Sequence, residues 1–221
     1  MSQQEDQYHS IAGQFEAEYK DKGSRFIAYL RDIKDEEAFQ QLMNDVKSLH
    51  LKARHHCYAF RLKGDEILER YSDDGEPSGT AGRPILNQLI SHDLEDVACI
   101  IVRYFGGTKL GTSGLIKAYK TAAQLAIREA DILTLYQTDV LHIDFDYAIM
   151  GQLMDTIKKF SFSIAASNFD TKPYIQLELR LRLIQNAPKQ ILASLLNRNI
   201  EDIDEETSID GLRFRFPESM Q

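Results

Sequence analysis

Apolar positions along the first 130 residues alternate between strand-like and helix-like spacing. Val97–Phe105 begins with six consecutive apolar residues, which is typical of a strand covered on both faces. Phe39, Leu42 and Val46 recur on one helical face. The pattern predicts strands over 24–30, 57–62, 66–71 and 97–105 and helices over 35–49, 83–90 and 112–130. In the last helix, the residues expected to face the core are Ile116, Tyr119, Ala123, Ile127 and Ala130.

The pattern changes character after Thr134. Leucine and isoleucine alternate with polar residues over 175–183, as in a half-exposed strand, and Asn186 with Pro188 marks a helix start. The expected elements are strands over 141–147, 162–169, 175–183 and 212–216, a helix over 149–160 and a helix from 186. This βαββαβ order is typical of a ferredoxin-like split unit. We therefore predict an α+β protein with domains over 1–134 and 135–221.

Composition restricts the partners and the compartment. The net charge is −8 and the pI is near 5.3, so any binding to nucleic acid must come from a local basic patch. The sequence has no apolar run near 18 residues, and its polar, acidic start does not resemble a signal peptide. Cys57 and Cys99 lie in strand-like surroundings, which favours reduced thiols in a cytoplasmic protein. We expect no metal and no cofactor.

Seven of the twelve glycines lie in two loops between Asp73 and Tyr119. The second loop joins a strand to a helix start, where free backbone N–H groups and the helix dipole favour an anion. The predicted anion-binding loop consists of Gly106, Gly107, Thr108, Gly111, Thr112 and Ser113.

This loop is not a Walker-type phosphate loop. Gly111 is followed by Thr112 and Ser113 instead of the required lysine, and Lys109 lies inside the loop. The segment 110–113 resembles the phosphate loop of GHMP kinases, although no base or magnesium ligand completes such a site. Three interpretations stay open: a helix cap made by Thr112 or Ser113, a surface for a polyanion or partner, and nucleotide catalysis.

Basic residues gather around this loop. Between Ala98 and Arg128 the sequence has five basic residues and no acidic one, a local inversion of sign in an acidic chain. Such groups contact phosphates without reading sequence, although a solvated helix face is the simpler alternative. The residues predicted to bind a nucleic acid or another partner are Arg54, His56, Arg61, Arg83, Arg103, Lys109, Lys117 and Lys120.

No other cluster indicates catalysis. Asp73, Asp74 and Glu76 stand in a string of turn-forming residues, so we interpret them as part of a turn. His55 and His56 point to opposite faces of a strand and cannot easily share a metal. We predict no catalytic residues. The outward positions expected for the second domain include no aromatic ring, so we interpret it as a protein-docking module, not a base-reading sheet.

Four segments resemble the IMPACT/YigZ family. They are Asp73–Leu86 (DDGEPSGTAGRPIL), Val102–Ile116 (VRYFGGTKLGTSGLI), Lys22–Ala28 (KGSRFIA) and the spaced residues Ala53, His55, Cys57, Ala59 and Arg61. The resemblance spans most of residues 10–130. It implies that the first domain is like domain IV of elongation factor G, a fold shared with ribosomal proteins and GHMP kinases, and that the second is like its domain V.

The resemblance also implies a role, because eukaryotic relatives regulate translation by binding a large activator of the amino-acid-starvation kinase. We therefore expect a non-enzymatic, translation-associated regulator that binds structured RNA, the ribosome or a translation-associated protein through the first domain. The alternatives are an enzyme that handles a phosphate or nucleotide at Gly106–Gly114, and a protein–protein regulator without RNA contact. No membrane partner and no sequence-specific DNA binding are expected.

Overall fold

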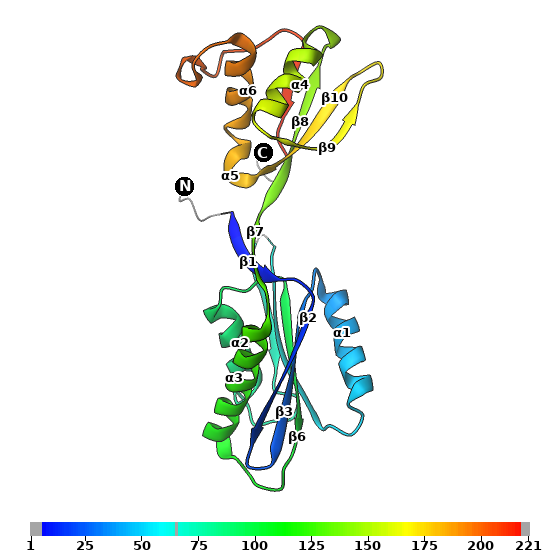
Figure 1. The fold of residues 1–221 in the computed structure, drawn as a ribbon, viewed down its shortest axis with the longest axis vertical. Helices are drawn as coiled ribbons and strands as arrows, with labels where there is room; N and C mark the ends of the chain where they lie inside the picture. Colours follow the sequence, from blue (N-terminus) through cyan, green and yellow to red (C-terminus); the bar gives the residue numbers. More distant parts are fainter. Residues whose placement is uncertain (1–5, 65, 218–221) are drawn as a thin grey trace. The chain divides into compact units, whose positions relative to one another are not determined.

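A computed structural model describes residues 6–64 and 66–217 as a mixed α+β protein with antiparallel sheets (Figure 1). The chain divides into two compact units. One is Tyr8–Leu135, and the other runs from Tyr136 onward and includes Asp6 and Gln7. The predicted fold class of two α+β units is confirmed. Among the described residues, no helix combines the length and the apolar character that crossing a bilayer requires.

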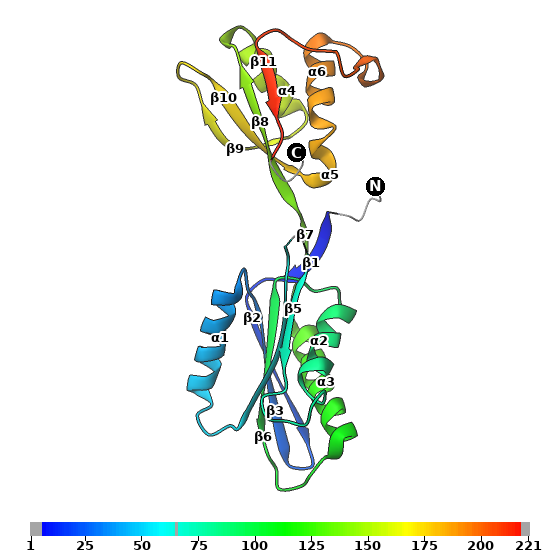
Figure 2. The ribbon, with the colours of Figure 1, turned by 180° about the vertical axis from the view of Figure 1, so that it is seen from behind.

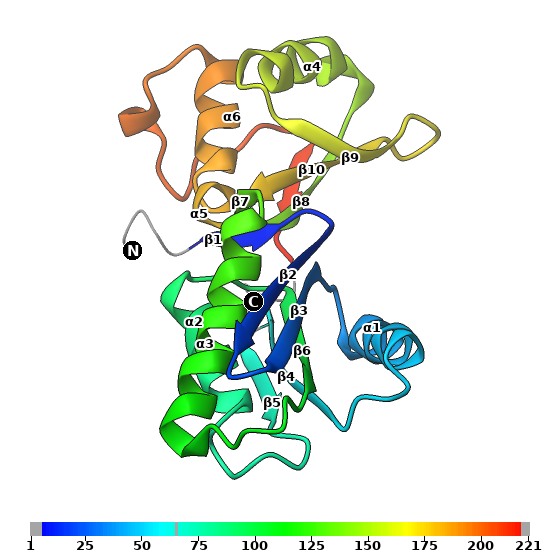
Figure 3. The same ribbon diagram turned by 60° about the horizontal axis from the view of Figure 1, so that its bottom comes forward.

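The first unit is built on a five-stranded sheet with helices on both faces. The strand order is β2-β3-β6-β4-β5, and β6 pairs antiparallel with both β3 and β4. Helix α1 lies on one face, and α2 and α3 lie on the other (Figure 3). The bounds are β2 Gln14–Asp21, β3 Ser24–Asp32, α1 Glu36–Leu49, β4 His55–Leu62, β5 Leu68–Ser72, α2 Gly82–Ser91, β6 Val97–Tyr104 and α3 Gly111–Glu129.

Strand β6 is the centre of this sheet because its residues are buried on both faces. Ala98 and Ile100 pack in the cluster formed with α1, whereas Cys99 and Ile101 pack in the cluster formed with α2 and α3. The expectation of a strand covered on both faces is confirmed. Helix α1 begins after Asp35, whose carboxylate accepts a hydrogen bond from the Ala38 N–H at 2.7 Å.

The sequence pattern did not predict three strands, which are β1 (Gln7–Ile11), β2 and β7 (Ile132–Tyr136). Strands β1 and β7 pair with each other. In β2 the inward positions are only partly buried and alternate with charged residues, so its apolar signal is weak. In α3 the expected core residues Tyr119, Ala123 and Ile127 are buried. Ile116 is exposed, however, and the buried face also includes Leu115 and Ala118.

The second unit has the predicted βαββαβ order. Its sheet order β11-β8-β10-β9 is the split β-α-β arrangement, and α4 and α6 accompany the sheet (Figure 2). The bounds are β8 Thr138–Phe145, α4 Met150–Lys159, β9 Ser163–Asn168, β10 Tyr174–Arg180, α6 Ala187–Leu196 and β11 Leu212–Arg215, with short helices α5 Leu181–Ile184, η1 Tyr147–Ile149 and η2 Ile200–Asp202.

Two expectations for the second unit were wrong. The strand expected over 175–183 ends at Arg180, because the chain turns into α5 and buries Ile184. The strand also starts one residue earlier, at Tyr174, whose ring stacks on outward-facing His142 with centroids 4.8 Å apart. The outer face of this sheet therefore carries an aromatic side chain, which is contrary to the expectation that its outward positions include no aromatic ring.

Asp6 forms a buried ion pair with Arg180. Its side chain is 2% exposed and accepts hydrogen bonds from Arg180 Nε at 3.0 Å and Nη2 at 2.8 Å. The hydrogen bond from Arg180 outweighs burial and lowers the pKa of Asp6. The acidic start of the chain thus contributes a structural residue as well as polarity.

The strand register brings four loops of the first unit to one end of its sheet. Arg103, near the end of β6, lies opposite both Phe26 and His55. Since strand β3 starts at this end and β4 also starts there, the segments 22–23, 50–54, 73–81 and 106–110 converge at this end. We call it the loop end.

We predict that Gly106→Ala strongly destabilises the protein. A Cβ at this residue would lie 1.9 Å from the carbonyl carbon of Gly23 and 2.1 Å from the amide nitrogen of Ser24. Because backbone cannot move aside like a flexible side chain, we expect a loss of about 3 kcal/mol or more in urea unfolding.

Gly107→Ala is the matched control for this prediction. Gly107 has φ +88°, but nothing lies within 4 Å of its ideal Cβ position. The free energy of unfolding of Gly107→Ala should therefore fall only by the amount that backbone strain costs, about 1–2 kcal/mol. Equal losses for the two variants would show that the close approach of the loops is not what residue 106 requires.

Candidate functional site

The first glycine-rich loop is organised around the carboxylate of Asp73. Asp73 Oδ1 accepts hydrogen bonds from the N–H groups of Ala81 and Gly82, both at 2.9 Å, and Oδ2 accepts one from Gly79 at 2.8 Å. Burial raises the pKa of Asp73, but these three donors outweigh it and hold the pKa below its usual value. Asp73 therefore fixes the path of the loop into α2.

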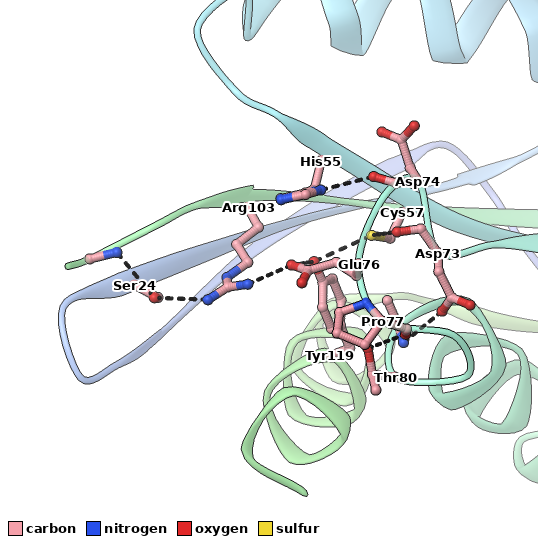
Figure 4. A network of polar contacts seen from close by, with 12 residues as sticks. Ser24, His55, Cys57, Asp73, Asp74, Glu76, Pro77, Thr80, Arg103 and Tyr119 are labelled. Carbon is pink, nitrogen blue, oxygen red and sulfur yellow. Dashed lines mark hydrogen bonds and ion pairs between the residues drawn. The ribbon is translucent and has the colours of Figure 1, made fainter. Parts of the chain in front are cut away.

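A buried ion pair joins this loop to β6 (Figure 4). Arg103 Nη1 donates to Glu76 Oε1 at 2.6 Å, and the two side chains are only 8% and 4% exposed. The Tyr119 hydroxyl of α3 donates to the same oxygen at 2.8 Å. Glu76 lies in the turn that the sequence predicts, and its carboxylate is in addition the internal counter-ion of Arg103.

Strand β4 is tied to the same loop. The Asp74 carboxylate accepts a hydrogen bond from the His56 N–H at 2.6 Å, and its carbonyl oxygen accepts one from His55 Nδ1 at 2.8 Å. Cys57 Sγ donates to the Asp73 carbonyl oxygen at 2.9 Å. Burial raises the pKa of the Cys57 thiol, so it stays protonated and acts as a structural group.

Three of the predicted basic residues are buried instead of facing solvent. Arg103 pairs with Glu76 as described, and His56 is buried on the α1 face of the sheet, where desolvation lowers its pKa. Arg61 lies six residues along β4 from His55, about 20 Å toward the other end of the sheet. It donates to Glu69 at 3.1 Å and to the Leu94 carbonyl oxygen at 2.9 Å. Their expected role as solvent-facing cations is corrected, because the strand alternation turns all three inward.

The other five predicted cations are exposed: Arg54, Arg83, Lys109, Lys117 and Lys120. None of them forms an ion pair with another described residue. Arg83 lies in the first turn of α2, with its guanidinium 5.6 Å from the centroid of the Tyr71 ring. These five residues are called the exposed basic set below.

The predicted anion-binding loop leads into α3 at Gly111. Gly107 and Gly111 have φ +88° and +71°, and nothing lies near their ideal Cβ positions. Glycine is favoured at both positions because of the positive φ, since a side chain would have room there. No side chain caps the first turn of the helix, so the capping interpretation of Thr112 or Ser113 was wrong. Together with Thr108, these hydroxyl residues are exposed.

A hollow of about 440 Å³ lies at the loop end, where β4 begins and β6 ends. We call it the basic pocket; its lining residues are Lys52, Arg54, His55, Arg103, Tyr104 and Phe105. Arg54 and Arg103 were predicted as binding residues, and the other four were not. A sequence signal existed, since Lys52, Arg54, His55 and His56 make a short basic run. The proximity of this run to residues 103–105 depends on a strand register that the sequence does not display.

The described residues include no group of three or more His, Cys, Asp or Glu side chains placed to hold a metal ion.

Comparison with known proteins relates this site to one family. The Impact N-terminal domain model matches residues 22–127. The IMPACT family member YvyE of Bacillus subtilis is 30% identical over 173 residues, which cover 76% of this chain and 80% of YvyE. The IMPACT family member YigZ of Escherichia coli is 41% identical over 110 residues, or 49% of this chain and 54% of YigZ. The chain belongs to the IMPACT family.

A solved structure extends the likeness beyond the matched domain. The crystal structure of a hypothetical protein aligns with a TM-score of 0.63 and 27% identity, covering 91% of this chain and 99% of that one. The resemblance to the IMPACT/YigZ family that the motifs indicated is confirmed. In this IMPACT chain, residues from all four motif segments meet at the loop end: Ser24, His55, Glu76 and Arg103.

We predict that Glu76→Ala lowers the free energy of unfolding by about 3–5 kcal/mol, because it leaves the Arg103 charge buried and unpaired. Glu69→Ala is the matched control, since it removes the carboxylate partner of another buried arginine. The Glu69 side chain is 34% exposed and Arg61 keeps the Leu94 carbonyl, so we expect a loss of at most about 1 kcal/mol. Urea unfolding of both variants checks this. Similar losses for the two variants would mean that the Glu76–Arg103 ion pair contributes no more to stability than the Glu69–Arg61 pair.

We predict that Asp73→Asn destabilises the protein most at neutral pH, by about 1–3 kcal/mol. The pKa of Asp73 is lowered in the folded state, so its stabilisation is present above the usual value of 3.8 and is lost as the pH falls through the folded-state value. Urea unfolding of wild type and variant between pH 2 and 7 should show a difference that shrinks below about pH 3.8. A difference that stays constant across this range would contradict the prediction.

Proposed function

We propose that this protein is a non-enzymatic, cytoplasmic, translation-associated regulator that binds structured RNA through the exposed basic set. Membership of the IMPACT family supports the link to translation. The resemblance to this family implies such a role, because its eukaryotic members regulate translation. The proposal includes the likeness of the first unit to domain IV of elongation factor G, and of the second unit to its domain V.

The observation that carries this proposal is the contrast between buried and exposed cations. The chain has a net charge of −8, yet five arginine and lysine side chains around the glycine loops are exposed and make no ion pair with a described residue. Arg103, in contrast, has an internal carboxylate partner. When unpaired, solvated cations contact RNA phosphates, they release the counterions condensed on the RNA, and this release favours binding.

A protein partner without RNA is the second candidate, and exposed leucines favour it. Leu49 and Leu51, which flank the turn between α1 and β4, are 67% and 86% exposed. Apolar side chains in such positions fit a protein interface better than a phosphate backbone. Salt dependence separates the two candidates, because binding to RNA weakens steeply with ionic strength.

We predict that Lys109→Glu/Lys117→Glu weakens binding of a fluorescent RNA hairpin at least about 10-fold. The double substitution should also reduce the salt slope, which is the slope of log affinity against log salt concentration, by roughly two. Anisotropy titrations at 50 and 200 mM KCl measure both effects. Lys172→Glu/Lys189→Glu makes the same charge change at exposed positions of the second unit and should bind like wild type.

Equal affinity of wild type and the Lys109/Lys117 variant would exclude these lysines from the binding surface. RNA binding that is absent in the wild type, with a protein captured instead, would favour the second candidate. A nucleotide enzyme would gain thermal stability from millimolar ATP or GTP, and we expect no such gain.

A further inference from the structure

We infer that the basic pocket is a binding site for one unpaired ribonucleotide, with the phosphate at Lys52 and Arg54 and the base on Phe105. This inference rests on the proposed RNA binding and names the part of the RNA that this end of the unit takes. The pocket volume, about 440 Å³, lies in the range of sites that enclose a small ligand.

The cations of the pocket are of two kinds. Lys52 and Arg54 are exposed and form no ion pair with a described residue, so they are available to a phosphate. The six lining residues include no carboxylate. Because Glu76 neutralises Arg103, the charge that the pocket offers to an anion comes from Lys52 and Arg54.

Arg103 contributes a fixed wall with an unused donor. Its guanidinium is held by Glu76 at 2.6 Å and by Ser24 Oγ at 3.5 Å. Its side chain is more than nine-tenths buried, and Nε has no hydrogen-bond partner in the described chain. Buried donors without a partner are uncommon in folded proteins. Because this nitrogen is enclosed by the protein, Arg103 serves the pocket as a fixed wall, and the contacts with a phosphate are left to Lys52 and Arg54.

The two aromatic residues differ in their freedom. The Tyr104 hydroxyl is bound to His50 Nδ1 at 2.9 Å, and His50 Nε2 is bound to the Tyr29 hydroxyl at 2.7 Å, so the Tyr104 ring is fixed. Phe105 is 60% exposed, and the Arg103 guanidinium lies 5.7 Å from its ring centroid. An exposed ring beside cations is the arrangement with which proteins stack single-stranded bases.

His55 adds an acceptor to a set made mostly of donors. Its Nδ1 donates to the Asp74 carbonyl oxygen, which leaves Nε2 unprotonated in the neutral ring. An acceptor suits a ribose 2′-hydroxyl, the group that distinguishes RNA from DNA. A paired base inside a helix cannot enter a concave pocket, so the nucleotide must be unpaired.

The experiment titrates full-length protein with a fluorescent single-stranded octaribonucleotide, and with the same sequence as DNA and as duplex RNA. Phe105→Ala should weaken octaribonucleotide binding roughly 5- to 100-fold, and Phe105→Tyr should restore it. Leu51→Ala, which removes an exposed apolar side chain close by in the chain but outside the pocket lining, should have no effect. Lys52→Gln/Arg54→Gln should reduce the salt slope by roughly two. Circular dichroism and thermal melting confirm that each variant is folded.

The outcomes separate this inference from the proposed function. If Lys109→Glu/Lys117→Glu weakens RNA binding but Phe105→Ala does not, the pocket inference fails and the proposed function stands. If wild type binds no RNA, both fail. Equal affinity for single-stranded and duplex RNA, or equal affinity for the octaribonucleotide and the same sequence as DNA, also overturns the inference. Preference for the single strand together with the loss in Phe105→Ala supports it.

Discussion

The first unit depends on one buried ion pair, between Glu76 and Arg103. Two charges removed from water are stable only when their geometry is good and their remaining polar atoms find partners. Here the Tyr119 hydroxyl donates to Glu76 and the Ser24 hydroxyl accepts from Arg103, which leaves Arg103 Nε as the one buried atom of the pair without a partner among the described residues. The pair therefore links a loop, strand β6, helix α3 and the start of strand β3. None of these segments can move away without leaving a buried charge exposed to an apolar interior.

This constraint explains why the glycine-rich motifs are long and specific. Gly82 and Gly106 have no room for a side chain because another backbone segment lies against them. Asp73 and Glu76 use their carboxylates to hold their own loop and its neighbours. Much of the motif thus builds the loop end, and the binding that we propose is left to the residues that stay exposed there.

The sequence was sufficient for the fold class, most helices and strands, and the family, because periodicity and motif residues are local signals. It was insufficient for the roles of Arg61 and Arg103. Whether an arginine faces solvent depends on strand alternation and on a partner such as Glu76, 27 positions away. The basic pocket was missed for the same reason, since His55 and Arg103 become neighbours only through the register of β4 with β6. Strand β2 was missed because its charged outer face dominates its composition.

The same geometry accounts for how an acidic chain can present positive charge. The segment with Asp73, Asp74 and Glu76 would be expected to cancel nearby lysines. Glu76 is instead neutralised by Arg103, and Asp73 directs both oxygens toward backbone N–H groups of its own loop. Asp74 is the one of the three whose side chain stays largely open to solvent, at 42%. Lys52 and Arg54 thus keep their charge at the surface while most of the acidic charge beside them faces inward. The anion binding that we propose at this end depends on which charges are internally partnered, and net charge is a poor guide to it.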